Sequence, residues 1–393
     1  MELFGKTVLV RVDFNVPMDN GIVADDIRIR TPLATIKNLQ KHGAKVVLIS
    51  HIGKTSDGND IQSLQPLIPT IKQIYGCPVR FIGNYSIQEI KSMIDQTSSE
   101  NLILLENIRR YPEEESCALD FAKKIAGLGD FFVNEAFSVS HRKHASVFGI
   151  PQFLPSEIGE NFKREIKNIE NFFQNTSDKK MALIGGSKLK TKVKLLKKLV
   201  TKFDKLAIGG GLSGAFLPYL ADKSLTAFGL KEYSEEVEEI IENAKSFGCE
   251  LIIPTDFISL ISANHDHAIM MNQNSNVNVF DIGFDSIELL KRHISSCDTI
   301  LWNGPLGMFE HSPFEFGTKS IAEFIAERTE NHRLISIIGG GDTGFAVKKF
   351  QLADKMTYVS TSGGAFLNYL ENEDCPALEA IRISREKLSP FYH

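Results

Sequence analysis

The sequence predicts an α/β protein with two doubly wound parallel-sheet (Rossmann-like) domains, joined by a helix and separated by a cleft. Short apolar, β-branched runs alternate with helical stretches along the whole chain, as in parallel sheets covered on both faces. There are more such runs than one open sheet ordinarily holds. A proline-marked, charge-rich helical stretch also interrupts the pattern near the middle.

The expected elements fall into two series. Strands of the first series are predicted at residues 7–12, 45–50, 79–82, 101–105 and 131–133, with helices at 33–42, 64–75 and 117–126. Strands of the second series are predicted at residues 181–184, 206–208, 250–253, 299–302, 336–338 and 357–359. Pro151 and Pro155 precede a charged helix at 157–174, so we expect one domain over 1–155, a connecting helix over 156–175 and a second domain over 176–372.

Composition narrows the class of protein. The 393 residues carry a net charge of -5, which gives no overall attraction for nucleic acid or an anionic membrane, so any anion site must be local. We expect no signal peptide and no membrane partner, because the first ten residues lack a basic segment followed by an apolar one and no apolar run reaches about 20 residues. The five cysteines form no Cys-x-x-Cys pair, which favours reduced thiols and a cytoplasmic location.

Cationic and polar residues follow the predicted strands of the first half. Because ligands of parallel sheets bind beyond the carboxyl ends of the strands, these side chains are expected to meet in one crevice. Any one of them could be a solvated surface charge, but the set favours a pocket for an acid with several negative groups. The set is Arg11, Asp13, Asn15, Arg28, Arg30, His51, Lys54, Asn107, Arg109, Arg110, Asn134, His141, Arg142 and His144.

Glycines occupy the equivalent places in the second half. They follow predicted strands at 185–186, 209–211, 339–341 and 363–364, where backbone N–H groups can approach phosphate at a helix N-terminus. Each pair alone could be a tight turn. Lys188 and Lys192 add point charges for phosphate, and Asp342 is a candidate Mg²⁺ carboxylate.

Two other nucleotide motifs are incomplete. Gly209, Gly211 and Gly214 fit G-x-G-x-x-G after a strand, but no acidic residue ends a second strand about 20 residues later. The Gly-Lys-Thr triplets at Gly5 and Gly53 lack the earlier glycine of a Walker A loop. The partial match at Gly209–Gly214 leaves a nicotinamide oxidoreductase as an alternative, which titration with NADH would test.

The chain resembles the phosphoglycerate kinase family over nearly its whole length. In the first half the resemblance rests on Val-Arg-Val-Asp-Phe-Asn-Val-Pro (10–17), Asp-Ile-Arg-Ile-Arg (26–30), Ser-His-Ile-Gly (50–53), Leu-Glu-Asn-Ile-Arg (105–109) and His-Arg-Lys-His-Ala-Ser (141–146). In the second half it rests on Gly-Gly-Ser-Lys (185–188), Ile-Gly-Gly-Gly (208–211), Trp-Asn-Gly-Pro-Leu-Gly-Met-Phe-Glu (302–310) and Ile-Gly-Gly-Gly-Asp-Thr (338–343).

The resemblance implies reversible phosphoryl transfer from 1,3-bisphosphoglycerate to ADP, giving 3-phosphoglycerate and ATP, with Mg²⁺ on the nucleotide. It implies a glycolytic, monomeric, cytoplasmic enzyme whose segment 373–393 returns to the first domain. The acid-binding positions are Asp13, Phe14, Asn15, Arg28, His51, Ile52, Gly53, Lys54, Arg109 and Arg142, with Arg11 and His141 nearby. The nucleotide positions are Lys188, Lys192, Asn303, Glu310, Gly340, Gly341, Asp342 and Thr343, with Asp342 holding the metal through the nucleotide.

Transfer between two anions needs positioning and charge neutralisation more than covalent chemistry. We therefore assign Arg28 and Lys192 to the moving phosphoryl group, with backbone N–H groups of Gly340, Gly341 and Gly364 beside it. Closure about the helix at 157–174 would bring the two ligands into line.

Five residues depart from the family pattern. Lys54 replaces a planar arginine by a point charge, Ser138 and Ser362 replace glycines, Glu135 replaces an Asp and Phe284 replaces a Pro. Lys54 and Ser362 leave a binding protein without catalysis as a second alternative, which a coupled ATP assay would separate.

Overall fold

The computed structural model describes residues 3–53, 62–174, 179–220, 234–260, 268–271, 279–360 and 362–387. They form two compact units, each built on a parallel six-stranded sheet, so the predicted fold class is confirmed. One unit comprises Met1–Lys167 and Asn372–His393, and the other comprises Asn168–Glu371. Among the described helices, none is long and apolar enough to cross a membrane.

The first unit has its strands in the order β5-β6-β4-β1-β7-β8. In that order they span Val79–Ile82, Leu102–Leu105, Lys45–Ile49, Thr7–Arg11, Phe131–Asn134 and Ser156–Ile158. Its helices are α1 (Ile27–Arg30), α2 (Leu33–Lys41), α3 (Ile68–Tyr75), α4 (Ile87–Asp95), α5 (Pro112–Glu115), α6 (Leu119–Ala126) and α15 (Pro376–Lys387). A hairpin of β2 (Met18–Asp19) and β3 (Ile22–Val23) completes it.

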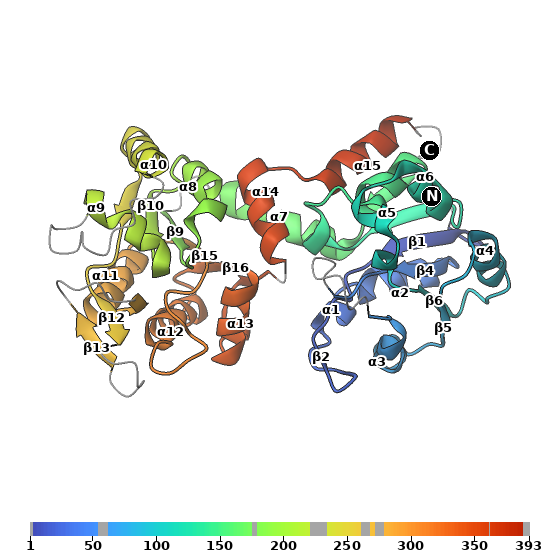
Figure 1. Ribbon diagram of the computed structural model, residues 1–393, viewed down its shortest axis with the longest axis horizontal. Helices are drawn as coiled ribbons and strands as arrows, with labels where there is room; N and C mark the ends of the chain where they lie inside the picture. Colours follow the sequence, from blue (N-terminus) through green and yellow to red (C-terminus); the bar gives the residue numbers. More distant parts are fainter. Residues whose placement is uncertain are drawn as a thin grey trace. The chain divides into compact units, whose positions relative to one another are not determined.

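Alternation along the strands builds a core on each face of this sheet. Val8, Val10 and Leu48 pack with residues of α2 and α3, whereas Leu9 and Val47 pack with residues of α4 and α6. Successive side chains of a strand point to opposite faces, so continuous apolar strands require helices on both sides. Figure 1 shows these helices around the labelled strands β1, β4 and β6.

Strand β8 was not expected from the sequence. Residues Ser156–Ile158 pair in parallel with β7, whereas the sequence analysis placed the start of the connecting helix at residue 157. The helix itself, α7, begins at Glu160 and ends at Gln174. Edge pairing with β7 satisfies the backbone groups of this segment, which a local helical pattern does not reveal. The first sheet thus continues past residue 155.

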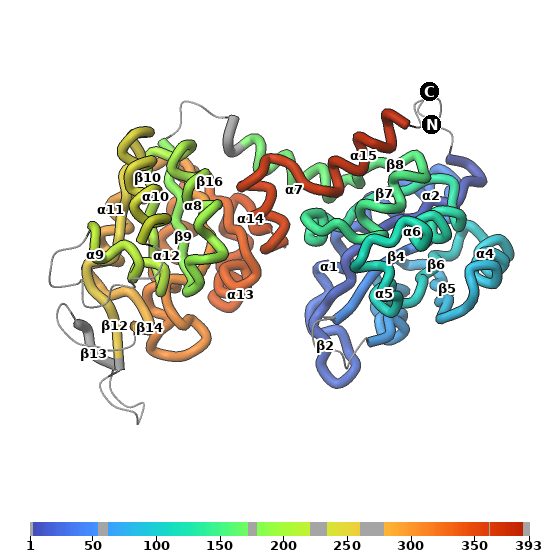
Figure 2. Tube along the Cα trace, turned by 45° about the horizontal axis from the view of Figure 1, so that its top comes forward, coloured from blue at the N-terminus to red at the C-terminus, as the bar shows by residue number. Residues whose placement is uncertain are grey.

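The C-terminal helix α15 packs within the first unit. Ser384 Oγ donates a hydrogen bond of 2.7 Å to Leu154 O, and Arg385 forms an ion pair of 2.6 Å with Glu157 of β8. Figure 2 shows α15 beside β8. Helix α15 therefore belongs to the same unit as β1, although the two are far apart in the chain.

The second unit has its main sheet in the order β11-β10-β9-β15-β16-β17. In that order the strands span Glu250–Ile252, Lys205–Ile208, Lys180–Ile184, Thr299–Asn303, Ile335–Gly339 and Tyr358–Val359. Its helices are α8 (Val193–Leu199), α9 (Leu217–Leu220), α10 (Ser234–Phe247), α11 (Phe284–Ser295), α12 (Phe316–Glu330), α13 (Gly341–Lys349) and α14 (Gly363–Asn372). An antiparallel sheet of β13 (Ala268–Met271), β12 (Phe257–Leu260) and β14 (Val279–Ile282) was not foreseen.

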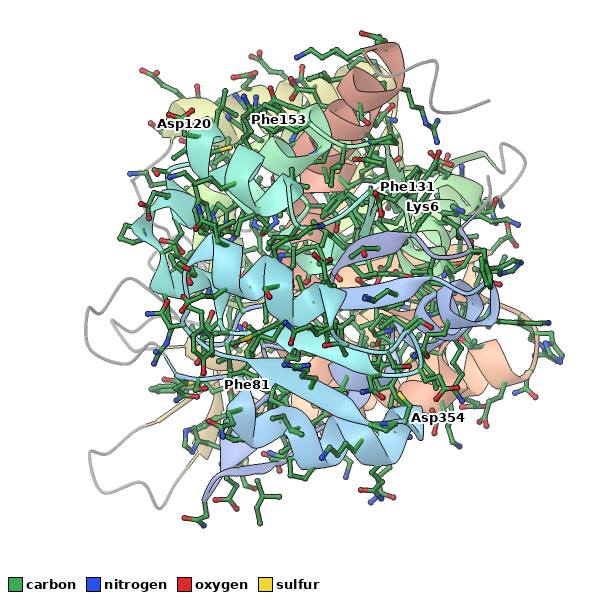
Figure 3. The ribbon with its side chains drawn as sticks, turned by 90° about the vertical axis from the view of Figure 1, so that its right-hand side faces the viewer. Lys6, Phe81, Asp120, Phe131, Phe153 and Asp354 are labelled. Carbon is green, nitrogen blue, oxygen red and sulfur yellow. The ribbon has the colours of Figure 1, made fainter. Side chains whose placement is uncertain are left out.

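In both units the parallel register brings the carboxyl ends of the strands to one edge. Arg11 at the end of β1 lies opposite Ile49 of β4 and Asn134 of β7, and Asn303 of β15 lies opposite Ile184 and Gly339. The opposite edge of the first sheet holds Lys6 and Phe131, which Figure 3 labels. Loops that follow the strands can therefore form a site.

Candidate active site

The first unit gathers predicted acid-binding residues around the carboxylate of Asp13. Arg28 Nη1 lies 2.9 Å from Asp13 Oδ2 and donates a second hydrogen bond of 3.0 Å to the carbonyl of Asn15. His51 Nε2 lies 3.9 Å from Asp13 Oδ1. Ser138 also donates a hydrogen bond to Asp13, so the residue that replaces a family glycine contacts the site directly.

Asn15 and Arg109 organise the loop after β4. Asn15 Oδ1 accepts a 3.0 Å hydrogen bond from Gly53 N, and Arg109 donates to the carbonyl of Gly53. Arg109 is only 6% exposed, and its Nε lies 3.5 Å from the carboxylate of Glu115. Burial lowers the pKa of Arg109, and the charge of Arg142 lowers it further.

The remaining predicted acid-binding residues lie differently. Arg142 is exposed and its Nε is 3.4 Å from His141 Nε2. The side chains of Phe14 and Ile52 are buried in the hydrophobic core, so only their backbone could touch a ligand. Lys54 lies outside the described residues.

A buried polar group behind the site was missed by the sequence analysis. Glu114 is fully buried and accepts hydrogen bonds from Ser146 N at 2.8 Å and Ser146 Oγ at 2.5 Å. Burial raises the pKa of Glu114, whereas the neighbouring Arg11 lowers it. Ser146 ends the 141–146 motif, which was the available signal, but only the fold shows that Glu114 reaches it.

The second unit contains a cavity of about 490 Å³ at the carboxyl ends of β9, β15 and β16. The N-termini of α13 and α14 line it, so their backbone N–H groups provide positive ends for phosphate. Of the predicted nucleotide and catalytic residues, the cavity lining includes Lys188, Lys192, Asn303, Gly340, Gly341, Asp342, Thr343 and Gly364.

Gly340 shows why glycine is needed where α13 begins. Its φ is +98°, a left-handed conformation that side chains other than glycine rarely adopt. A Cβ atom there would lie 2.5 Å from Asn303 Nδ2, which itself donates a 2.8 Å hydrogen bond to Gly339 O. Ser362 is buried just before α14, so this departure from glycine leaves Gly363 and Gly364 at the cavity.

Lys192 is a partly buried cation that lines this cavity. Its Nζ donates hydrogen bonds of 2.6 Å to Gly185 O and 2.9 Å to Asn303 Oδ1. Burial lowers the pKa of Lys192 to about 8, although the carboxylate of Asp342 acts in the opposite direction. Lys188, by contrast, is exposed. A phosphate group would provide the negative partner that the buried ammonium lacks.

The same cavity fits a magnesium nucleotide better than a metal held by protein alone. Among the residues that the structure describes, no cluster of three or more His, Cys, Asp or Glu side chains could hold an ion. Asp342 is an exposed carboxylate on the first turn of α13, beside the phosphate-binding backbone. Mg²⁺ is commonly bound by one or two carboxylates together with phosphate oxygens, so this donor set suits it.

Glu310 is the predicted nucleotide residue that is not among those lining the cavity. Its side chain is exposed, and its carbonyl lies 3.4 Å from Lys349 Nζ of α13. The Gly209–Gly214 pattern forms a 3-10 helix over Gly210–Ala215 and is also absent from that lining.

Comparison with known proteins shows the family of this chain. The family model described as phosphoglycerate kinase matches residues 1–373. The phosphoglycerate kinase of Dictyoglomus turgidum is 38% identical over 385 residues, covering 97% of this chain and 96% of the relative, and that of Bartonella bacilliformis is 39% identical over 386 residues, covering 96% of each.

Two solved structures are similar throughout. Phosphoglycerate kinase from Coxiella burnetii superposes with a TM-score of 0.83 at 32% identity, and that from Pyrococcus horikoshii with 0.83 at 25% identity, each covering 98% of both chains. The chain therefore belongs to the phosphoglycerate kinase family, whose members are transferases of glycolysis.

Proposed function

We propose that this chain transfers a phosphoryl group reversibly from 1,3-bisphosphoglycerate to ADP, with the acid bound on the first unit and the magnesium nucleotide on the second. The observation that carries this assignment is the contrast between the two units. One presents cations around Asp13, and the other has a cavity of about 490 Å³ lined by Lys192 and two helix N-termini.

The acid would be recognised by side chains that suit its charge and hydroxyl group. Arg28, Arg109 and Arg142 offer guanidinium donors, which pair with carboxylate and phosphate oxygens. Asp13 and Asn15 can take the hydroxyl group. Membership of the family supports this reading, because these residues stand in its motifs.

The nucleotide would be held by its phosphates and its metal. Lys188 and Lys192 supply positive charge, and Gly340, Gly341 and Gly364 supply backbone N–H groups at the starts of α13 and α14. Asp342 would hold Mg²⁺ together with the phosphate oxygens, and the bound metal would neutralise charge that develops during transfer. Glu310 is assigned to the ribose hydroxyls from its motif.

The transfer itself requires no general base from the protein, because the attacking oxygen belongs to an ionised phosphate or carboxylate. We assign Arg28 and Lys192 to the transferring phosphoryl group, with Gly341 and Gly364 stabilising its oxygens through backbone N–H groups. Such electrostatic stabilisation is the main protein contribution in phosphoryl transfer.

Two further proposals concern the cellular location and the oligomeric state of the enzyme. All five cysteines are free thiols, which is typical of a reducing compartment, so we propose a cytoplasmic enzyme. We also propose that it acts as a monomer, which light scattering on the purified protein would check.

A coupled assay tests the proposed reaction. Purified protein is supplied with 3-phosphoglycerate and ATP, and formation of 1,3-bisphosphoglycerate is followed by its reduction with NADH and a coupling dehydrogenase. Turnover is expected only when Mg²⁺ is present. Lys192→Met provides the matched control with the same fold and a defective nucleotide site. A folded, monodisperse protein with no turnover above the coupling enzymes alone would remove the proposal.

A further inference from the structure

The protonation state of His51 is determined by a buried arginine behind it. Arg11, the last residue of β1, is fully buried, and its Nη2 lies 3.0 Å from His51 Nδ1. A guanidinium group has only hydrogen-bond donors, so Nδ1 must be the acceptor in this contact. The proton of a neutral His51 therefore resides on Nε2, the nitrogen on the side of Asp13.

Arg11 is itself held in one orientation by the group of Glu114 and Ser146. Ser146 Oγ lies 2.5 Å from Glu114 Oε1 and accepts a 2.8 Å hydrogen bond from Arg11 Nε. Because the carboxylate accepts the hydroxyl proton of Ser146, the serine lone pairs are left for Arg11. Arg11 also bonds the carbonyl of Val12. These two contacts, through Nε and Nη1, leave Nη2 directed at His51.

The surroundings of His51 also disfavour its charged form. The side chain is only 2% exposed, and burial lowers its pKa well below the ordinary value, with further lowering by Arg11, Arg109, Arg142 and Arg28. On the opposing side, Asp13 lies 3.9 Å from Nε2 and Glu114 lies behind Arg11. Protonating Nδ1 would place two N–H donors face to face at 3.0 Å, a clash that a bound anion at Nε2 does not remove.

We infer that Arg11 is a positioning residue that holds His51 as the Nε2–H tautomer, so that His51 offers the acid substrate a neutral hydrogen-bond donor and no positive charge. The inference rests on the proposed function for the identity of the substrate, but not for the state of the imidazole. Among the described acid-binding residues, the positive charge then comes from the arginines, and recognition by His51 is insensitive to pH near neutrality.

Nitrogen NMR on the intact protein with ¹⁵N-labelled histidine tests the imidazole directly. The His51 signals are identified by their loss in His51→Gln. Between pH 6 and pH 8, with and without 3-phosphoglycerate, we expect a protonated Nε2 and an unprotonated Nδ1. A proton on Nδ1, in either the other tautomer or the imidazolium, overturns the inference. This readout stands even if the protein has no kinase activity, so the two proposals fail separately.

Kinetics of two His51 variants test the neutral donor. The side-chain amide of glutamine reaches the position of Nε2, whereas the shorter asparagine amide reaches that of Nδ1. We expect His51→Gln to stay within a few-fold of the parent in KM for 3-phosphoglycerate, and His51→Asn to raise it by about 10- to 100-fold. The ratio of the KM of the parent to the KM of His51→Gln should not change with pH. A ratio that changes through pH 6.5, or equal losses in both variants, would show that the charge of His51 matters.

The role of Arg11 is tested by removing it together with its buried counter-ion. Arg11→Met alone would leave Glu114 uncompensated and could unfold the chain, so the variant combines Arg11→Met with Glu114→Gln. Once circular dichroism confirms folding, we expect both His51 tautomers and a roughly tenfold rise in KM, with a smaller change in kcat. Ser384→Ala, a buried site distant in sequence, controls for general destabilisation. A pure Nε2–H tautomer in the double variant means that Arg11 does not determine it.

Discussion

Replacing Lys192 by methionine should change the pH dependence of stability in a defined direction. The substitution keeps the length of the side chain but removes its buried charge. In the folded protein, the Lys192 pKa is about 8, compared with an ordinary value of 10.5. Below pH 8 the folded and unfolded chains both carry the charge, and the folded chain bears its full burial cost.

The magnitude follows from the two pKa values. Their separation corresponds to about 3 kcal/mol of destabilisation near pH 7, because one pKa unit is worth about 1.4 kcal/mol. Since the unfolded chain binds more protons between pH 8 and pH 10.5, the stability of the parent rises with pH over that range. Between pH 7 and pH 10, the free energy of unfolding of the parent should rise by about 2.5 kcal/mol relative to that of Lys192→Met.

At neutral pH the net effect of Lys192→Met on stability should be small. The variant escapes the burial cost but loses the hydrogen bonds to Gly185 O and Asn303 Oδ1. Hydrogen bonds from a charged group contribute about 1.5 kcal/mol or more each, so their loss offsets the relieved burial cost and we expect the stability of the variant to lie within about 1 kcal/mol of the parent at pH 7. Its affinity for ADP should nevertheless fall by at least about tenfold, because the charged partner of the phosphates is gone.

Urea unfolding followed by tryptophan fluorescence measures this difference. Trp302 is the sole tryptophan, and it lies fully buried on β15 of the same unit, so its signal reports the unit that contains Lys192. Subtracting variant from parent at each pH cancels the titrations that the two share. Lys188→Met, at an exposed lysine of the same cavity, is the control and should leave the pH profile parallel to the parent. A parent-minus-variant difference that stays flat from pH 7 to pH 10 would refute the assigned burial cost.

Three further predictions concern the proposed chemistry. Arg28→Ala should lower kcat by about 10³- to 10⁵-fold, with a much smaller rise in KM for the acid. Arg30→Ala is the control and should change neither, because Arg30 is exposed and pairs with Asp26. A normal kcat in Arg28→Ala would remove the catalytic assignment of Arg28. Asp342→Asn should weaken ADP binding in the presence of Mg²⁺ but not in its absence, as calorimetry can measure; equal losses in both would mean that the carboxylate does not act through the metal. Gly340→Ala should destabilise the second unit by about 1–3 kcal/mol, and unchanged unfolding would show that this backbone tolerates a side chain.

The division of the chain into two parallel-sheet units could be predicted from local pattern. Along β1, Val8 and Val10 pack into one core and Leu9 into the other, and continuous apolar strands of this kind are typical of parallel sheets covered on both faces. Local pattern could not predict the edge strand β8 or the antiparallel sheet of β12, β13 and β14. These strands are defined by their pairing with another strand. Short apolar segments carry no signal of their partner.

For the candidate sites, sequence order placed Lys192, Asp342 and the glycines 340–341 and 363–364 after strands, and the fold brings them to one cavity. The burial of Phe14 and Ile52 and the exposed position of Glu310 were not visible in the motifs. A motif records which residues recur together, but it does not record which way each side chain points. The assignment of these residues to ligands stays a prediction.

The sequence by itself therefore determined the fold class, the family and the chemical character of each half, because these depend on residue type and spacing along the chain. Only the tertiary structure decided how Arg11 meets His51, how Glu114 reaches Ser146 and how deeply Lys192 is buried. Protonation states depend on solvation and on charges a few ångströms away, and those neighbours come from segments far apart in the chain. The state of an ionisable group is thus a property of the folded protein, even where its identity is plain in the chain.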